Sequence, residues 1–337
     1  MRRSGKRRAK KNDRACDPNP DHRATSSRSL LDSHPNIFDA RLGSGGSVET
    51  ERLTWSWRGA TIELGLDWSG QGPTVLLLPA LSSISTRREM QSLQQRLSSH
   101  YRTVAIDWPG FGDRSRPPLD WTPDAYRAFL MHVFESVVAS PYAAIAAGHG
   151  ATYLLAHACA HPTSLKGLVL IAPTWRGPLP TMMSGHRPIF DRMCRMVDRP
   201  ALGPLVYKLN VNRPLVRMMA AGHVYLDPAW LSGERLKQKL AVTRARGARH
   251  ASVRFVTGAL DPLASREEFL DLARCAAVPM LTVYGMQTPP RSRAEIEALI
   301  ALPGMRSACL AQGKLGLHEE FPEAVAQAIE PFLAQAE

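Results

Sequence analysis

The residues best placed to do chemistry lie in the stretch YAAIAAGHGATYLLAHACAHP, from Tyr142 to Pro162. A short apolar run, a Gly-rich turn and a helical pattern follow one another, which predicts the sharp turn that presents a catalytic nucleophile. The motif for such a turn is G-x-S-x-G, and the chain has Gly148-His149-Gly150-Ala151-Thr152. Gly150 then stands where the serine is expected. Glycine has no side chain, so this turn is predicted to present no nucleophile.

Other titratable and hydroxyl side chains could do chemistry elsewhere. His149 precedes Gly150, and we expect it to pack at the end of the strand. Asp107 follows a strand, where it can hydrogen-bond a loop or face a pocket. Asp261 could act as a displaced acid, but we expect it to cap a helix that begins at Pro262. Ser82, Ser83 and Ser85 are loop serines that could offer a relocated nucleophile. The last candidates are two histidines at i, i+4 spacing, His157 and His161.

The elements that must position these residues alternate along the chain. Residues 52–68 predict an antiparallel hairpin with its turn at Arg58-Gly59. Apolar strands then alternate with amphipathic helices up to about residue 174, and the same pattern returns after residue 276. Such alternation predicts a mainly parallel sheet covered by helices on both faces. We expect a core of residues 48–174 and 277–337, interrupted by a helical cap insertion of residues 175–276.

Several segments resemble the α/β-hydrolase superfamily in their order and spacing. They are TVLLLPA, AIDWPGFGDRSRPP, AAGHGAT, GLVLIAP, VPMLTVYG and HEEFPEAVAQAIEPFL, and together they cover about residues 50–335. The resemblance implies an α/β-hydrolase fold with a helical cap. It also implies a nucleophile at the elbow, an acid after a later strand, a histidine near the last strand and an oxyanion loop.

This sequence departs from the family pattern at every one of these positions. Gly150 replaces the serine, and Thr288 or its neighbour Gln287 replaces the acid. Lys314 or Leu315 replaces the histidine, and His318 falls on a variable position. The oxyanion loop, normally His-Gly, is Pro79-Ala80, and the predicted pocket is lined by Pro79, Ala80, Leu81, His149 and Ala151. Because the triad works as a unit, its joint loss predicts that classical serine hydrolysis is absent.

Composition limits the possible locations and partners. The net charge is +12, and ten Lys or Arg stand against three Asp in residues 1–30. We expect residues 1–47 to be a disordered basic tail and linker, with contact to anionic lipid or nucleic acid as the alternative. The tail is followed by no apolar signal segment, and the five cysteines have no metal-ligand spacing. These observations predict a reduced, cytoplasmic protein with no transmembrane segment, cofactor or metal.

Three hypotheses about function remain open at this point. The first is a non-hydrolytic member of the superfamily that binds a small apolar molecule or a partner in the pocket between cap and core. The second is a divergent hydrolase or lyase with a site rebuilt from His318, Asp261 or Asp107. The third is an interaction scaffold whose basic tail docks on nucleic acid or membrane. The basic residues 234–250 predict a helix with a solvated face, with an acidic partner or an anionic lipid headgroup as the alternative.

Overall fold

The fold is built on one eight-stranded sheet, which a computed structural model describes within residues 48–114, 116–162 and 165–335. The tail and linker expected over residues 1–47 lie outside the described residues. The strand order is β1-β2-β4-β3-β5-β6-β7-β8, in which β2 is antiparallel to β1 and β4 and all other neighbours are parallel. The strands are β1 Glu49–Trp57, β2 Ala60–Ser69, β3 Thr74–Leu78, β4 Arg102–Ile106, β5 Ala143–Ala147, β6 Gly167–Ile171, β7 Met280–Gly285 and β8 Arg306–Leu310.

The hairpin predicted at the start of the sheet is confirmed. Strands β1 and β2 pair antiparallel with Trp57 opposite Ala60, which leaves a two-residue turn. Both turn residues have positive φ, 48° at Arg58 and 78° at Gly59. Positive φ at both positions matches the turn that suits the right-handed twist of a hairpin.

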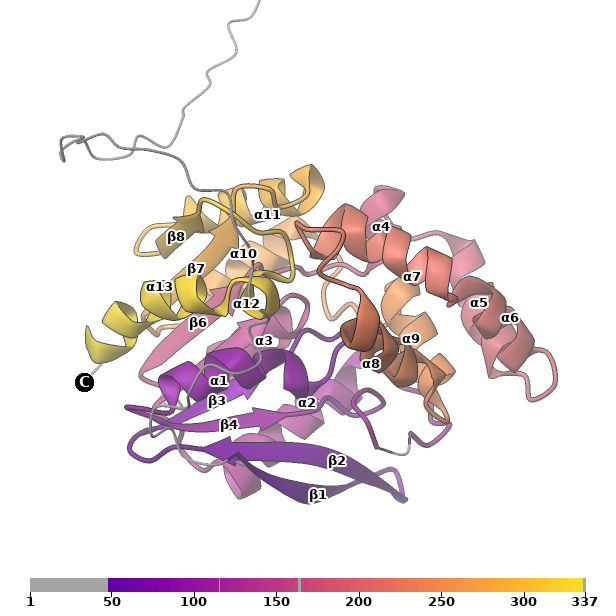
Figure 1. Cartoon of the computed structure of the whole chain (residues 1–337), viewed down its shortest axis with the longest axis horizontal. Helices are drawn as coiled ribbons and strands as arrows, with labels where there is room; N and C mark the ends of the chain where they lie inside the picture. Colours follow the sequence, from indigo (N-terminus) through magenta and orange to yellow (C-terminus); the bar gives the residue numbers. More distant parts are fainter. Residues whose placement is uncertain (1–47, 115, 163–164, 336–337) are drawn as a thin grey trace, which may run out of the picture. The chain divides into compact units, whose positions relative to one another are not determined.

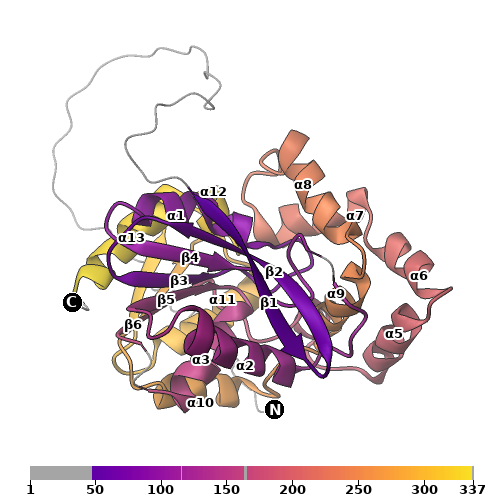
Figure 2. The same cartoon turned by 90° about the horizontal axis from the view of Figure 1, so that it is seen from below.

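Helices cover both faces of the sheet, as Figure 2 shows. Alternate residues of β3 point to opposite faces: Leu76 and Leu78 join one apolar cluster, and Val75 and Leu77 join the other. One face is covered by α1 Gln91–Leu97, α12 Leu317–Glu320 and α13 Pro322–Gln335, and the other by α2 Pro123–His132, α3 Gly150–Ala160, α10 Arg266–Cys275 and α11 Pro290–Ile300. Two short turns, η1 Arg87–Met90 and η2 Val133–Val137, precede α1 and follow α2. The predicted α/β-hydrolase architecture is confirmed.

The chain between β6 and β7 forms a helical cap at one side of the sheet (Figure 1). It comprises α4 Pro178–Met182, α5 Pro188–Asp198, α6 Gly203–Asn210, α7 Arg213–Met219, η3 Ala220–Val224, α8 Gly233–Arg244 and α9 Ala248–Thr257. Helix α9 is the centre of this cap, because α4, α5, α6 and α8 all pack against it.

Helix α10 belongs to the core and not to the cap, so the boundary predicted at residue 276 is too late. It packs against α3 and α11, and Phe269, Leu270 and Ala273 join the apolar cluster of the sheet. The helix begins after Ser265, whose side chain accepts a hydrogen bond from the Glu268 amide. The sequence pattern between residues 258 and 276 lacked a strand, and for that reason it looked continuous with the cap.

A disulfide joins α10 to α3 and contradicts the expectation that all cysteines are reduced. Cys159 and Cys275 are bonded, with a Cα–Cα distance of 5.1 Å. Cys194 and Cys309 take no part in this bond. Scattered cysteines reveal no pairing in a sequence, because the two partners are 116 residues apart and only the packing of α10 on α3 brings them together.

Candidate functional site

The turn between β5 and α3 is the candidate site, and its tip is Gly148. Gly148 has φ +52°, and its N–H donates to the Ile171 carbonyl at 2.9 Å. His149 and Gly150 lie outside the left-handed region, and Gly150 is the first residue of α3. A nucleophile at such an elbow occupies the strained residue of the turn. The structure therefore contradicts the placement of Gly150 at the tip, and the turn reads Ala146-Ala147-Gly148-His149-Gly150.

The space around the two glycines supports this correction. A Cβ built on Gly148 would lie 3.3 Å from the Ala80 Cβ, facing the loop that follows β3. A Cβ on Gly150 would instead lie 2.9 Å from the Pro79 carbonyl oxygen and 3.1 Å from the Trp108 ring. Gly150 thus allows α3 to approach the loop closely. The motif does not distinguish the two positions, because Gly148 and Gly150 are only two residues apart and either could be aligned with the serine.

The loop after β3 is held by groups that the sequence analysis did not assign. The Pro79 carbonyl accepts a hydrogen bond from Trp108 Nε1 at 2.8 Å, and the Ala80 N–H donates to Glu89 Oε1 at 2.5 Å. Pro79 and Leu81 are buried, whereas Ala80 and Gly148 are half-buried. In an active enzyme the amides of this loop would form part of the oxyanion hole. Here the Ala80 amide donates its hydrogen bond to a buried carboxylate instead.

Glu89 is the centre of a buried charged cluster between cap and core. Its carboxylate lies 3.3 Å from His318 Nε2 and 3.8 Å from Lys239 Nζ. Lys239, from α8, also bonds Glu319 at 2.9 Å, and the Tyr225 hydroxyl donates to the same carboxylate at 2.7 Å. We call Glu89, Lys239, His318, Glu319 and Tyr225 the cap–core cluster. It links the cap to the loop at the elbow.

The electrostatics of this cluster favour its charged form. Burial raises the pKa of Glu89, but the hydrogen bond and charge of His318 and the charge of Lys239 outweigh it, so the pKa lies below its usual value. Burial lowers the pKa of Lys239, but the carboxylates of Glu319 and Glu89 outweigh it, so this pKa lies above its usual value. Lys239 and Glu89 thus stabilise each other's ionised state.

The positions expected for acid and base carry other contacts. Thr288 is buried, and its N–H donates to the Gly285 carbonyl at 3.0 Å. Lys314 Nζ donates to the Ala221 carbonyl at 2.6 Å, and the Leu315 N–H donates to the His223 carbonyl at 3.3 Å. Lys314 and Leu315 therefore hold the segment after β8 against η3 of the cap.

His149 and Asp261 face each other behind the elbow. His149 Nε2 lies 3.5 Å from Asp261 Oδ1 and 3.3 Å from the Leu260 carbonyl. Burial lowers the pKa of His149 to about 4 and raises the pKa of Asp261 to about 8. Near pH 7 the two groups are therefore both neutral. Asp261 accepts a hydrogen bond at 2.8 Å from the N–H of Gly177, the residue before α4, and the helix expected at Pro262 begins only at Arg266.

The three residues proposed for a rebuilt site are not brought together. His318 contacts Glu89 and is 2% exposed. Asp261 contacts His149, and Asp107 bonds Arg87 through the main-chain N–H and the guanidinium, both at 2.7 Å. The loop serines also make local contacts: Ser82 accepts from the Ile84 N–H, Ser83 bonds Ser252 at 2.6 Å, and Ser85 bonds Glu89. Ser85 thus contacts the carboxylate of Glu89, whereas activation of a serine nucleophile requires contact with an imidazole, here that of His318.

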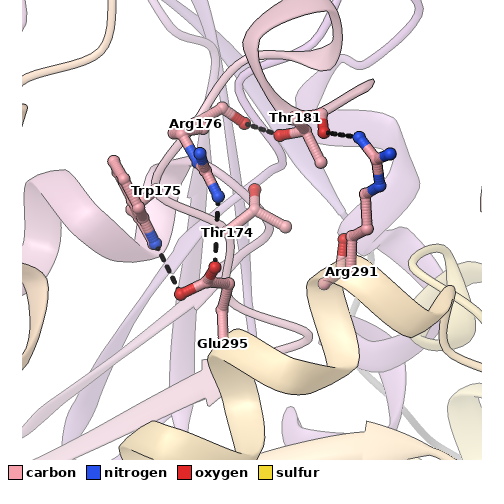
Figure 3. Close-up of a pocket in the computed structure, with 7 residues that line it drawn as sticks. Thr174, Trp175, Arg176, Thr181, Arg291 and Glu295 are labelled. Carbon is pink, nitrogen blue, oxygen red and sulfur yellow. Dashed lines mark hydrogen bonds and ion pairs between the residues drawn. The ribbon is translucent and has the colours of Figure 1, made fainter. Parts of the chain in front are cut away.

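Two cavities flank this region, and neither is lined by the elbow residues 148–150. The first, of about 10 Å³, lies beside Thr174 and has room for about one water molecule. Figure 3 shows Glu295 there between Trp175 and Arg176, with Arg291 reaching Thr181. The second is an open cleft of about 270 Å³ between residues 120–122 and the cap, with Cys194 and five charged side chains in its lining. The lining combines these charged groups with apolar ones such as Trp121 and Ala259.

Comparisons with known proteins define the class. The sequence model of the alpha/beta hydrolase family matches residues 75–328, so the chain belongs to this family. The structure is similar to a thermophilic esterase from Thermogutta terrifontis, with 18% identity, a TM-score of 0.65 and coverage of 85% of this chain and 99% of that one.

Two further solved structures are similar at comparable levels. The haloalkane dehalogenase DatA from Agrobacterium tumefaciens C58 has 17% identity and a TM-score of 0.64, with coverage of 86% of this chain and 97% of that one. The Cif epoxide hydrolase from Acinetobacter nosocomialis has 15% identity and a TM-score of 0.63, with coverage of 84% and 89%. A comparison with curated proteins finds no match. At these identities the likeness establishes the fold alone, because one fold supports many activities.

Proposed function

We propose that this protein is a non-hydrolytic member of the alpha/beta hydrolase family that acts by binding. The observation that carries the proposal is the residue at the elbow tip. Gly148 adopts the positive φ of a nucleophile position and directs no side chain at the loop after β3. A non-Gly residue held at such φ costs on the order of 1–3 kcal/mol, so an elbow without a nucleophile gains stability from glycine.

The surroundings of the elbow support the same conclusion. Thr288 and Leu315 supply neither a carboxylate nor an imidazole, and the Ala80 amide is bound to Glu89. Oxyanion stabilisation requires free amide donors aimed at the developing charge. The cap–core cluster, moreover, ties the cap to this loop through buried groups. Binding by the cap, or in the open cleft beside Cys194, agrees better with this arrangement than ester hydrolysis does.

Ester turnover and covalent labelling test this proposal. Wild type, Gly148→Ser and Gly150→Ser are incubated with short-chain nitrophenyl esters and, separately, with a fluorophosphonate probe. We expect no turnover and no labelling in the wild type. We expect Gly148→Ser to be the variant that labels, because its hydroxyl faces the loop at Ala80, and Gly150→Ser to remain inert or unstable. Turnover by the wild type through a labelled residue would refute the proposal.

The alternative of a rebuilt active site rests on one observation, the contact between His318 and Glu89. A buried pair of this kind can act in catalysis once a substrate reaches it. His318→Gln then distinguishes the two hypotheses. A loss of a measured wild-type activity that Glu89→Gln reproduces would support the rebuilt site, whereas no activity in any of the three proteins supports the binding role.

The location of the protein remains a prediction from its sequence. No helix in the described part of the chain is long and apolar enough to cross a membrane. The Cys159–Cys275 disulfide weighs against the reduced cytoplasm that we expected, since structural disulfides persist in oxidising compartments. Alkylation of native extracts followed by thiol counting checks this point. Four reactive cysteines or more would favour the cytoplasm, and three or fewer an oxidising compartment.

A further inference from the structure

An unusual concentration of apolar side chains lies on the outside of the cap. Nine large apolar residues stand out as exposed in the described part of the chain, and eight of them fall between residues 182 and 218. Their exposed fractions run from 37% to 66%. The eight are Met182, Met183, Ile189, Met196, Leu202, Leu205, Leu209 and Met218. Exposed apolar residues gathered in one region mark an interaction surface.

The helical spacing shows that these residues form outward stripes. In α5, Phe190, Cys194 and Val197 are buried toward α9, while Ile189 and Met196, seven residues apart, face outward. In and before α6, Leu202, Leu205 and Leu209 follow at steps of three and four, which places them on one face. Helices α5 and α6 pack against each other and lie at the end of the cap away from the sheet (Figures 1 and 2).

The same segment is strongly basic. Between residues 182 and 218 there are seven Lys or Arg and two Asp, a net charge of +5. All seven cations are exposed: Arg187, Arg192, Arg195, Arg199, Lys208, Arg213 and Arg217. Of the two carboxylates, Asp198 is bound to Arg254 and His250 at 2.7 Å each. The outer face therefore presents uncompensated positive charge around exposed apolar side chains.

We propose that this face, residues 182–218 of α4–α7, docks on an anionic lipid surface. Helices with an apolar stripe flanked by Lys and Arg bind in the headgroup region, where aliphatic side chains enter the acyl boundary and cations meet anionic lipids. A second copy of the chain would bring two faces of like charge together. Single-stranded nucleic acid is bound with aromatic side chains that stack on bases, and none of the eight residues is aromatic. Duplex nucleic acid is bound through its phosphates by Lys and Arg, which would leave the apolar stripe exposed to water.

Helix α8 is also basic but is not part of this surface. Its Lys239 points inward to Glu89 and Glu319 and is 7% exposed. One side of α8 is thus used to hold the cap on the core. The lipid-facing surface proposed here is on the other helices and does not depend on whether the elbow is catalytic.

Sedimentation of the full chain with vesicles tests the proposal. Phosphatidylcholine vesicles with and without phosphatidylserine are compared for wild type, Leu205→Asp/Leu209→Asp and Met286→Asp. Met286 is the matched control, because it is 50% exposed but lies on the core after β7. We expect wild type to bind only the vesicles with phosphatidylserine and to be released by salt. We expect the double variant to partition at least about tenfold less, and Met286→Asp to bind as wild type does.

Hydrogen exchange locates the contact independently of the basic tail, which all variants share. We expect amides of α5–α7 to gain protection when vesicles are added, with thermal unfolding of the free variants unchanged. Lys208→Glu provides a second variant and should weaken binding without altering the apolar stripe. The proposal is overturned by equal binding of wild type and double variant, by an equal loss in Met286→Asp, or by absent protection in α5–α7. Binding of duplex DNA that the same variants abolish would overturn it in favour of nucleic acid.

Discussion

Arg87 and Glu89 are two residues apart on η1, carry opposite charges and are both less than 5% exposed, yet they serve different parts of the molecule. Arg87 bonds Asp67 in β2 at 3.0 Å, Asp107 directly after β4 at 2.7 Å, and Asp113 in the loop that follows β4 at 3.0 Å. Glu89 instead reaches Ala80, His318 and, in the cap, Lys239. This short turn therefore binds the β2 and β4 region of the core through Arg87 and the cap through Glu89.

The two buried charges thus stabilise different parts of the fold. The partners of Arg87 lie in β2 and in the segment after β4, and these two strands already pair, so the arginine reinforces an arrangement that the sheet also specifies. The partners of Glu89 lie about 150 and 230 residues further along the chain. The described cap elements are all helices, so no strand pairing fixes the position of the cap in the same way. Buried ion pairs cost desolvation, and a positional role such as this is their best-supported use.

The largest expected effect follows from removing Arg87. Arg87→Met leaves three carboxylates without their central cation, and breaking a buried pair in this way costs about 3–5 kcal/mol. Denaturant unfolding measures the loss, with Arg88→Met as control. The Arg88 side chain is 59% exposed and bonds Asp113 at 3.2 Å, so its loss should cost about 0–1 kcal/mol. Equal losses in the two variants would show that burial does not distinguish the pairs.

Removing Lys239 should loosen the cap more than the core. Lys239→Met leaves Glu89 and Glu319 without their common cation, and we expect a loss of about 2–4 kcal/mol. Hydrogen exchange should rise in α8 before it rises in β3–β7. The double variant Glu89→Gln/Lys239→Met removes charges of both signs and should recover part of the loss. Uniform exchange throughout the chain would contradict a separate role for the cap–core cluster.

The elbow beneath Glu89 provides a smaller, paired comparison. Gly150→Ala forces a methyl group against the Pro79 carbonyl and Trp108, which costs about 1–3 kcal/mol. Gly148→Ala has more room but must adopt φ +52°, at a cost of about 1 kcal/mol. Thermal unfolding ranks the two. A larger cost at Gly148 would mean that strain, and not the contact between α3 and the loop, dominates at this turn.

The smallest effect is a pH dependence that Glu89 contributes. Its pKa is lowered in the folded state by His318 and Lys239, so its contribution to stability is complete above about pH 4.5, the usual pKa of the carboxyl. It is lost as the pH falls further, because protonation then favours the unfolded state. Compared with wild type, Glu89→Gln should show a shallower loss of stability below that pH. Parallel curves for the two proteins would exclude this role.

Much of the fold could be predicted because the sequence repeats one physical signal. Apolar runs such as residues 74–78 and 143–147 lack alternation, as expected for strands buried on both faces, and they were located to within about two residues. Helix ends were predicted less well. Thr122 is a residue type that favours a helix start and it precedes α2, but its side chain makes no capping hydrogen bond. The helix expected at Pro262 begins after Ser265.

The site was predicted less completely, because its contacts join distant segments. The sequence indicated the missing triad groups, but a motif with two glycines could not reveal which of them, Gly148 or Gly150, has positive φ. Nothing near Glu89 in the sequence indicates Lys239 or Glu319 as partners. Charge spacing reports only neighbours along one element, and these partners meet through the packing of the cap on the core.

The bond between Cys159 and Cys275 has a mechanical consequence. It closes a ring that contains β6 and the entire cap, so tension applied to the two chain ends passes directly from α3 to α10. The chain between the cysteines, which are 116 residues apart in the sequence, is then shielded from the load, and the fully stretched molecule is shorter by roughly 400 Å than its reduced form. The helices of the cap would therefore bear no tension, whereas the strands outside the ring would be pulled apart.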